Sequence, residues 1–150
     1  MKRLLCFCLL LMLAAAAHAR VERRVPATFV LSDDYDHFIG PTVVSSGHGK
    51  FDVSLGESHE GDPGFEGSEP GAEFEYAVVI YHLQPSRQPL PYLPKYVPVA
   101  RGKHRQSVMP LFKGSKKVRF QGVDFTISIQ KLSFTYGAGR TRVQVTAADS

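Results

Sequence analysis

The chain contains no tryptophan and no asparagine, and its only two cysteines, Cys6 and Cys8, lie close to the N-terminus. Without asparagine there is no N-glycosylation sequon. Both cysteines lie inside an apolar run that we expect to be removed. The remaining chain therefore has no disulfide to stabilise it and no cysteine nucleophile. About 130 residues remain, which is enough for one domain that buries its own core.

Long apolar runs are also absent, apart from one at the N-terminus. That run covers residues 4–17 and follows two positive charges. Small residues stand at its last position, Ala17, and two positions later at Ala19. This pattern is typical of a secretory signal peptide. The run is also shorter than the roughly 20 apolar residues of a spanning helix. We predict a signal peptide over 1–19, cleavage near Ala19, and a periplasmic or secreted mature chain without a transmembrane segment.

Alternation of apolar and polar residues dominates the rest of the chain. Because the side chains of a strand point alternately to its two faces, this pattern predicts strands. It recurs over residues 24–31, 50–56, 73–84, 116–132 and 140–147, with a break at Gln121 and Gly122. The third segment is apolar on both faces around Val79, as a central strand is. Glycines at 137 and 139 indicate the turn of a C-terminal hairpin.

No segment after the N-terminal run shows a sustained helical stripe. Short strands separated by connections with glycine and proline are typical of sandwiches and small barrels. We predict an all-β fold for residues 20–150: a single-domain antiparallel β-sandwich, Ig-like or jelly-roll-like, of six to eight short strands. A small β-barrel is the second choice, because the connections are uneven in length.

Two connections have unusual compositions. Residues 56–73 are rich in glycine and carboxylates and nearly free of apolar side chains, so little burial offsets the entropy lost on ordering. We predict a flexible acidic loop there. Residues 85–117 begin with five prolines between positions 85 and 98 and continue as a basic stretch. Prolines at this density favour extended or edge-strand backbone and disfavour a central strand.

Charge is divided along the sequence. Residues 20–75 hold twelve acids and four bases, whereas residues 76–150 hold two acids and twelve bases. Seven of those bases fall in residues 101–120, which contain no acid. One interpretation is a surface that attracts a polyanion or a membrane. The other is that the basic stretch neutralises the protein's own acidic half. Both interpretations stay open at this point.

The candidate binding residues are the cations of this stretch and the aromatic side chains beside them. Aromatic rings among lysines and arginines can stack on bases or sugar rings. Because export argues against nucleic acid, we expect an anionic polysaccharide, a lipid headgroup or an acidic protein as partner. The candidates are Arg101, Lys103, Arg105, Lys113, Lys116, Lys117, Arg119, Tyr92, Tyr96 and Phe112.

Metal and catalytic sites find little support in the sequence. The weak metal candidates are Asp33, Asp34, Asp36 and His59. The aspartates lack the glycine turn and terminal glutamate of a calcium-binding EF-hand loop, and one histidine is too few for structural zinc. The stretch around Ser58 lacks the second glycine of a nucleophile elbow, because position 60 is glutamate. We predict no catalytic residue, no metal site and no cofactor.

These observations favour an exported, non-enzymatic binding module whose basic face engages an anionic envelope polymer or an acidic protein. The first alternative is a structural or assembly subunit of the cell envelope that acts through edge-strand pairing. A small hydrolase or a metal-binding protein is the third possibility.

Overall fold

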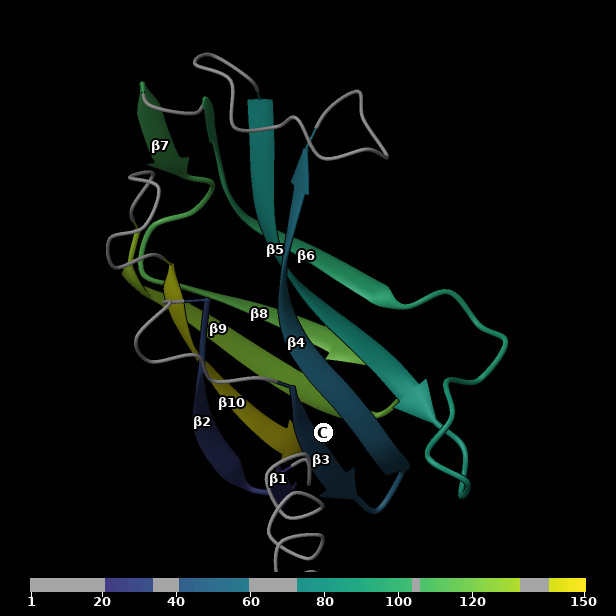
Figure 1. The fold of residues 1–150 in the computed structure, drawn as a ribbon. Helices are drawn as coiled ribbons and strands as arrows, with labels where there is room; N and C mark the ends of the chain where they lie inside the picture. The colour runs from purple at the N-terminus through teal and green to yellow at the C-terminus, as the bar shows by residue number, and fades with distance from the viewer. Residues whose placement is uncertain (1–20, 34–40, 60–72, 104–105, 133–140) are drawn as a thin grey trace, which may run out of the picture.

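A computed structural model describes residues 21–33, 41–59, 73–103, 106–132 and 141–150, without the side chains of 57–59. In these ranges the chain forms ten strands and no helix, arranged as two facing sheets (Figure 1). The larger sheet has the order β1 (Val21–Arg24), β3 (Thr42–Ser46), β4 (Gly49–His59), β5 (Glu73–Leu83), β6 (Lys95–Lys103) and β7 (Ser107–Pro110). The smaller has the order β2 (Ala27–Ser32), β10 (Arg142–Asp149), β9 (Val123–Lys131) and β8 (Ser115–Phe120).

Strand pairing is antiparallel throughout both sheets except between β1 and β3, which run parallel. The chain passes from the larger sheet to the smaller one between β1 and β2, at Val25 and Pro26. At this crossing the Val25 amide donates to the Ser45 carbonyl at 2.9 Å. The crossing therefore joins the two layers along one side of the sandwich.

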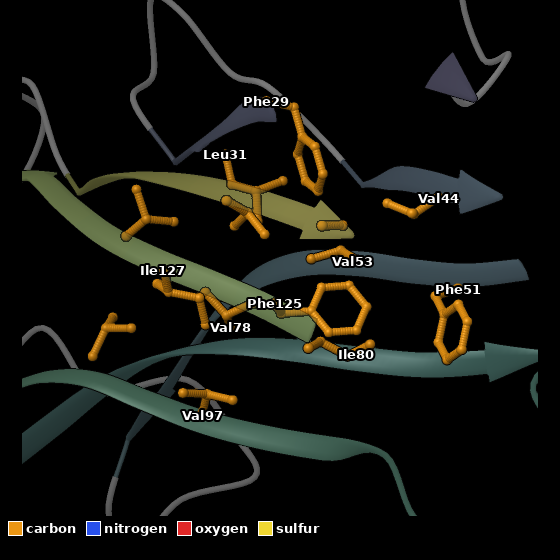
Figure 2. Packing of buried hydrophobic residues seen from close by; sticks show 14 of the residues in the cluster. Phe29, Leu31, Val44, Phe51, Val53, Val78, Ile80, Val97, Phe125 and Ile127 are labelled. Atoms are coloured by element: carbon orange, nitrogen blue, oxygen red, sulfur yellow. The ribbon is translucent and has the colours of Figure 1, made fainter. Parts of the chain in front are cut away.

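The core lies between the inner faces of the two sheets, as Figure 2 shows. Phe125 of β9 is fully buried and meets Phe51 of β4 edge to face, with ring centroids 5.8 Å apart. Val78 and Ile80 of β5 are also fully buried, which fits the central place of this strand between β4 and β6. Burial of such side chains contributes about 25 cal/mol for each Å² of apolar surface removed from water.

The prediction of an all-β sandwich is confirmed. In the part of the chain that the structure describes, no strand pairing joins the two sheets, so they do not close into a barrel. The ten strands exceed the six to eight expected because β1, β3, β6 and β7 lie outside the segments that alternation identified. β1 and β7 are short edge strands whose residues are mostly exposed, so they lack a strong alternating pattern.

Strands also extend into both connections that the sequence set apart. β4 continues to His59 and β5 begins at Glu73, because the two strands stay paired up to His59 opposite Phe74. β6, β7 and the start of β8 lie within residues 85–117. The proline at position 98 is accommodated where the register between β5 and β6 shifts, a place where a sheet tolerates the missing N–H.

Candidate functional site

The cations of β6 face carboxylates of the acidic half of the chain. Arg101 and Lys103 stand directly opposite Glu75 and Glu73 on β5. Arg101 donates from Nε and from one Nη to the same Glu75 oxygen, at 3.0 and 2.6 Å. The Lys103 Nζ lies 3.9 Å from the Glu73 carboxylate. The hydrogen bonds to Glu75 raise the pKa of the Arg101 guanidinium above its ordinary value. These two cations are thus neutralised one to one.

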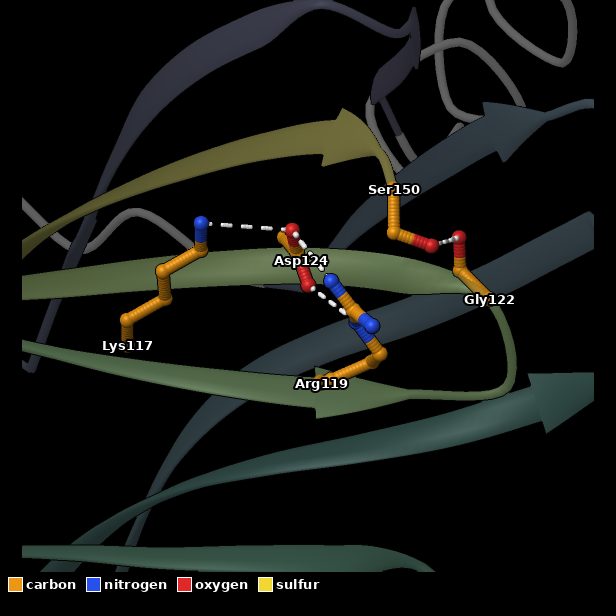
Figure 3. A network of polar contacts seen from close by, with 5 residues as sticks. All are labelled: Lys117, Arg119, Gly122, Asp124 and Ser150. Atoms are coloured by element: carbon orange, nitrogen blue, oxygen red, sulfur yellow. Dashed lines mark hydrogen bonds and ion pairs between the residues drawn. The ribbon is translucent and has the colours of Figure 1, made fainter.

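A second group of cations lies on β8, an edge strand of the smaller sheet. Lys117 and Arg119 share a single carboxylate, that of Asp124 on the neighbouring β9 (Figure 3). The Arg119 Nε lies 2.8 Å and the Lys117 Nζ 3.3 Å from this carboxylate. The hydrogen bond from Arg119 is the main reason why the pKa of Asp124 is lowered below its usual range.

Two further lysines lie beside this group and have no counter-ion among the described residues; by alternation, the Lys116 side chain leaves β8 on the side of Val118, opposite to Lys117. Lys113 lies in the connection that leads into β8, and Lys116 lies on β8 itself; both are exposed. Neither has a carboxylate partner among the described residues. We call Lys113, Lys116, Lys117 and Arg119 the β8 cationic cluster. In the described part of the chain, these four positive charges share one negative charge.

The two groups of cations point to opposite sides of the sandwich. On β5 and β6, Glu75 and Arg101 alternate with inward-facing residues such as Tyr76 and therefore project from the outer face of the larger sheet. On β8, Lys117 and Arg119 flank Val118, which packs against the core, and so project from the outer face of the smaller sheet. The predicted cations are thus divided between two faces, and Arg105 lies outside the described residues.

The three candidate aromatic residues occupy different environments. Tyr92 is 65% exposed in the connection between β5 and β6. Tyr96 is 45% exposed and donates its hydroxyl to Glu75 at 3.1 Å. Phe112 is partly buried and packs against the core, so its ring is not presented to a partner as Tyr92 is. Sequence position alone does not separate these three cases.

Two exposed aliphatic side chains were not predicted from the sequence. One lies next to Tyr92, and the other lies on β7. Leu93 is 89% exposed next to Tyr92, and Met109 is 65% exposed on β7. Apolar letters between prolines are the only signal in the sequence that could have identified them. Leu93 precedes β6 and Met109 lies opposite Arg101 near the other end of that strand, so these are two separate exposed apolar positions.

The metal candidates fall mostly outside what the structure describes: Asp34 and Asp36 are not included, and nothing is described of the His59 side chain. Asp33 is included, at the end of β2. No group of three histidine, cysteine or acidic side chains with metal-binding geometry occurs within the described ranges. In the same ranges no helix is long and apolar enough to cross a bilayer. The predicted signal peptide lies outside them.

Comparison with protein-family models, with curated proteins and with solved structures finds no match for this chain.

Proposed function

We propose that this protein is an exported, non-enzymatic binding module, and that its β8 cationic cluster engages an anionic polymer of the cell envelope. The observation that carries the proposal is the uneven distribution of counter-charge. Arg101 and Lys103 each have their own carboxylate, whereas the β8 cationic cluster has only Asp124 in the described part of the chain. The sequence pattern of residues 1–19 supports export.

The position of the cluster suits contact with an extended polyanion. Lys117 and Arg119 are 65% and 68% exposed, and β8 has no neighbouring strand on its outer side within the described sheet. A polymer can therefore run along this edge without displacing any strand. Lysines on an edge strand also discourage pairing with other strands. That protective role predicts no affinity for an anion, so a binding measurement separates the two roles.

The test compares two charge-matched double variants of the purified protein. Lys113→Glu with Lys116→Glu reverses the two cations of the cluster that have no described partner. Arg23→Glu with Lys95→Glu reverses two exposed cations of the larger sheet and serves as the control. Binding to an acidic polysaccharide, to anionic vesicles and to polyglutamate is measured at low and at high salt.

We expect the cluster variant to lose affinity for one of these probes by on the order of tenfold or more, because each reversal replaces an attraction by a repulsion. The control variant should lose much less. Binding of the wild type should weaken as salt rises, since charges are screened over about 10 Å at 0.1 M. Equal affinity of both double variants, or no binding of the wild type to any polyanion, would contradict the proposal.

A second candidate function, assembly through an edge strand, is favoured by a different observation. β7 pairs with β6 only from Ala100 onward, so residues 95–98 have a strand partner on one side alone within the described sheet. Exposed Leu93 and Tyr96 lie next to or within this segment. A partner strand could pair there and cover these side chains. A stoichiometric protein from envelope extract that Leu93→Glu loses, and the cluster variant keeps, would favour this function.

A further inference from the structure

Tyr96 of β6 lies on the outer face of the larger sheet, on the side away from the core. Its neighbour Val97 points into the core, as Val78 and Ile80 of β5 do (Figure 2). Because side chains alternate along a strand, Tyr96 and the residue opposite it, Val79, project to the other side. Tyr96 is 45% exposed there. This face therefore presents an aromatic side chain to solvent.

The Tyr96 side chain runs along the sheet instead of standing away from it. Its hydroxyl donates to the Glu75 carboxylate at 3.1 Å, although its backbone lies opposite Val79. The Ala77–Pro98 pair lies between these two positions. Ala77 is fully buried and yet does not belong to the core cluster, which a tyrosine ring lying over it explains. The ring thus has one face against the sheet and the other toward solvent.

An ion pair holds the hydroxyl end of this ring. Arg101 donates to one carboxylate oxygen of Glu75, at 3.0 and 2.6 Å, and Tyr96 donates to the other. A carboxylate can accept about four hydrogen bonds and a guanidinium can donate five. Among the described residues, these side chains use three of the acceptor positions and two of the donors. Both charged groups can therefore form further hydrogen bonds with a ligand.

The charges of this region cancel one another. Glu75 is paired with Arg101, and Glu73 lies 3.9 Å from Lys103 in the next outward-facing pair of the two strands. Asp52, which lies on the same face opposite Tyr81, is buried. A charged ligand would be attracted by one member of each pair and repelled by the other. The surface therefore favours an uncharged ligand whose polar groups can both donate and accept hydrogen bonds.

We propose that Tyr96, Glu75 and Arg101, which we call the tyrosine platform, bind a neutral sugar ring of a glycan. A sugar ring has a face of C–H groups, which can lie on the electron-rich face of the tyrosine ring. Its hydroxyls can donate to Glu75 and accept from Arg101. Tyr81 is partly exposed on the same face, two positions along β5 from Val79, and offers a second ring to the next sugar of a chain.

The tyrosine platform is arranged before a ligand arrives. The hydroxyl bond and the ion pair hold the tyrosine ring, and a tyrosine has only two side-chain torsions to order, so binding loses little conformational entropy. The tyrosine platform lies on the larger sheet, whereas the β8 cationic cluster belongs to the smaller one. Either site can therefore fail without the other.

The test is an NMR titration of the ¹⁵N-labelled protein with three neutral oligosaccharides: cellohexaose, maltohexaose and chitohexaose. We expect saturable shifts of the amides of Val79, Tyr96 and Arg101 with at least one of them. The affinity should be the same at low and at high salt, because the ligand is uncharged. Saturation by chitohexaose alone would assign the site to N-acetylated sugars, and saturation by a glucan to glucose chains. The absence of saturable shifts with all three, or an affinity that falls as salt rises, would overturn the proposal.

Variants locate the binding surface. Tyr96→Ala removes the stacking surface and should weaken binding by on the order of tenfold, the range of a lost stacking contact. Tyr92→Ala removes an exposed tyrosine of the β5–β6 connection and should leave the affinity unchanged. Leu93→Glu, which tests edge-strand pairing, should also leave it unchanged. Equal affinities of Tyr96→Ala and Tyr92→Ala would overturn the proposal.

Two conservative variants keep the test decisive if Tyr96→Ala lowers the melting temperature. Tyr96→Phe keeps the ring but loses its bond to Glu75, and Arg101→Lys keeps the charge but loses the planar set of donors. Each should weaken binding by roughly threefold to tenfold, the range of one lost hydrogen bond. Wild-type affinity in both variants would contradict the roles given to the hydroxyl and the guanidinium.

Discussion

Substituting Gly102 by alanine tests how β7 is held on the sheet. A Cβ at this position would clash with the Ser107 carbonyl oxygen, and the obstacle is backbone rather than a movable side chain. Ordinary contacts begin near 3.4 Å, so the two strands must separate by more than 1 Å. Hydrogen bonds between strands do not survive such a displacement, since their N···O distance is about 2.9 Å.

The stability that Gly102→Ala should lose follows from the number of residue pairs between β6 and β7. β6 and β7 pair only over Ala100–Pro110 to Lys103–Ser107, four register pairs in all. At about 1 kcal/mol net for each backbone hydrogen bond, losing most of them destabilises the fold by roughly 2–3 kcal/mol. For a chain of this size that corresponds to a fall in Tm of roughly 5–15 °C.

Two other glycines provide matched controls for this substitution. Gly56 has no positive φ, and a Cβ there meets Val79 at an ordinary 3.7 Å, so Gly56→Ala should leave Tm nearly unchanged or raise it. Gly114 has φ +70° with open space around it, so Gly114→Ala should cost only about 1–2 kcal/mol of backbone strain. Melting curves give the ranking, and hydrogen exchange should localise the Gly102→Ala effect to β7. If Gly102→Ala melts like Gly56→Ala, the close approach of the strands is refuted.

Two other predictions concern the core and acid stability. Phe125→Ala should destabilise the protein by about 3–5 kcal/mol in urea unfolding, because it opens a cavity beside Phe51 between the sheets; a loss below about 1 kcal/mol would contradict this packing. Arg119 lowers the pKa of Asp124 in the folded state. The ionised Asp124 carboxylate therefore stabilises the folded protein at pH values above its ordinary pKa of 3.8, and this stabilisation is lost as the pH falls below that value. Asp124→Asn should therefore show a shallower loss of stability below about pH 4 than the wild type, and identical acid limbs would argue against the pairing.

Much of the fold is readable from periodicity because one face of each main strand is buried. Phe29 and Leu31, Phe51 and Val53, and Phe125 and Ile127 each occur at a spacing of two and all point into the core. The break at Gln121-Gly122 is the turn between β8 and β9, where Gln121 has a φ of 51° and Gly122 a φ of 83°. These signals are local in sequence, so no tertiary information was needed to find them.

The strands that periodicity did not identify share a different physical basis. β1 is exposed along its whole length, and β7 is a four-residue strand that buries little. Their residues are extended because neighbouring strands offer hydrogen bonds, and this pairing partner is not encoded in a local pattern. β6 contains a proline that is accommodated at the register shift opposite Ala77, where β6 also has a described partner strand on one side alone.

The sequence by itself determined the inventory of charges: seven cations and no acid over residues 101–120, with most carboxylates earlier in the chain. Which cations are neutralised was decided only by the tertiary structure. Register places Glu75 opposite Arg101 across β5 and β6, while Asp124 faces Arg119 across β8 and β9. The physical reason is that alternation sets which way a side chain points, whereas strand order and register set which charge it meets.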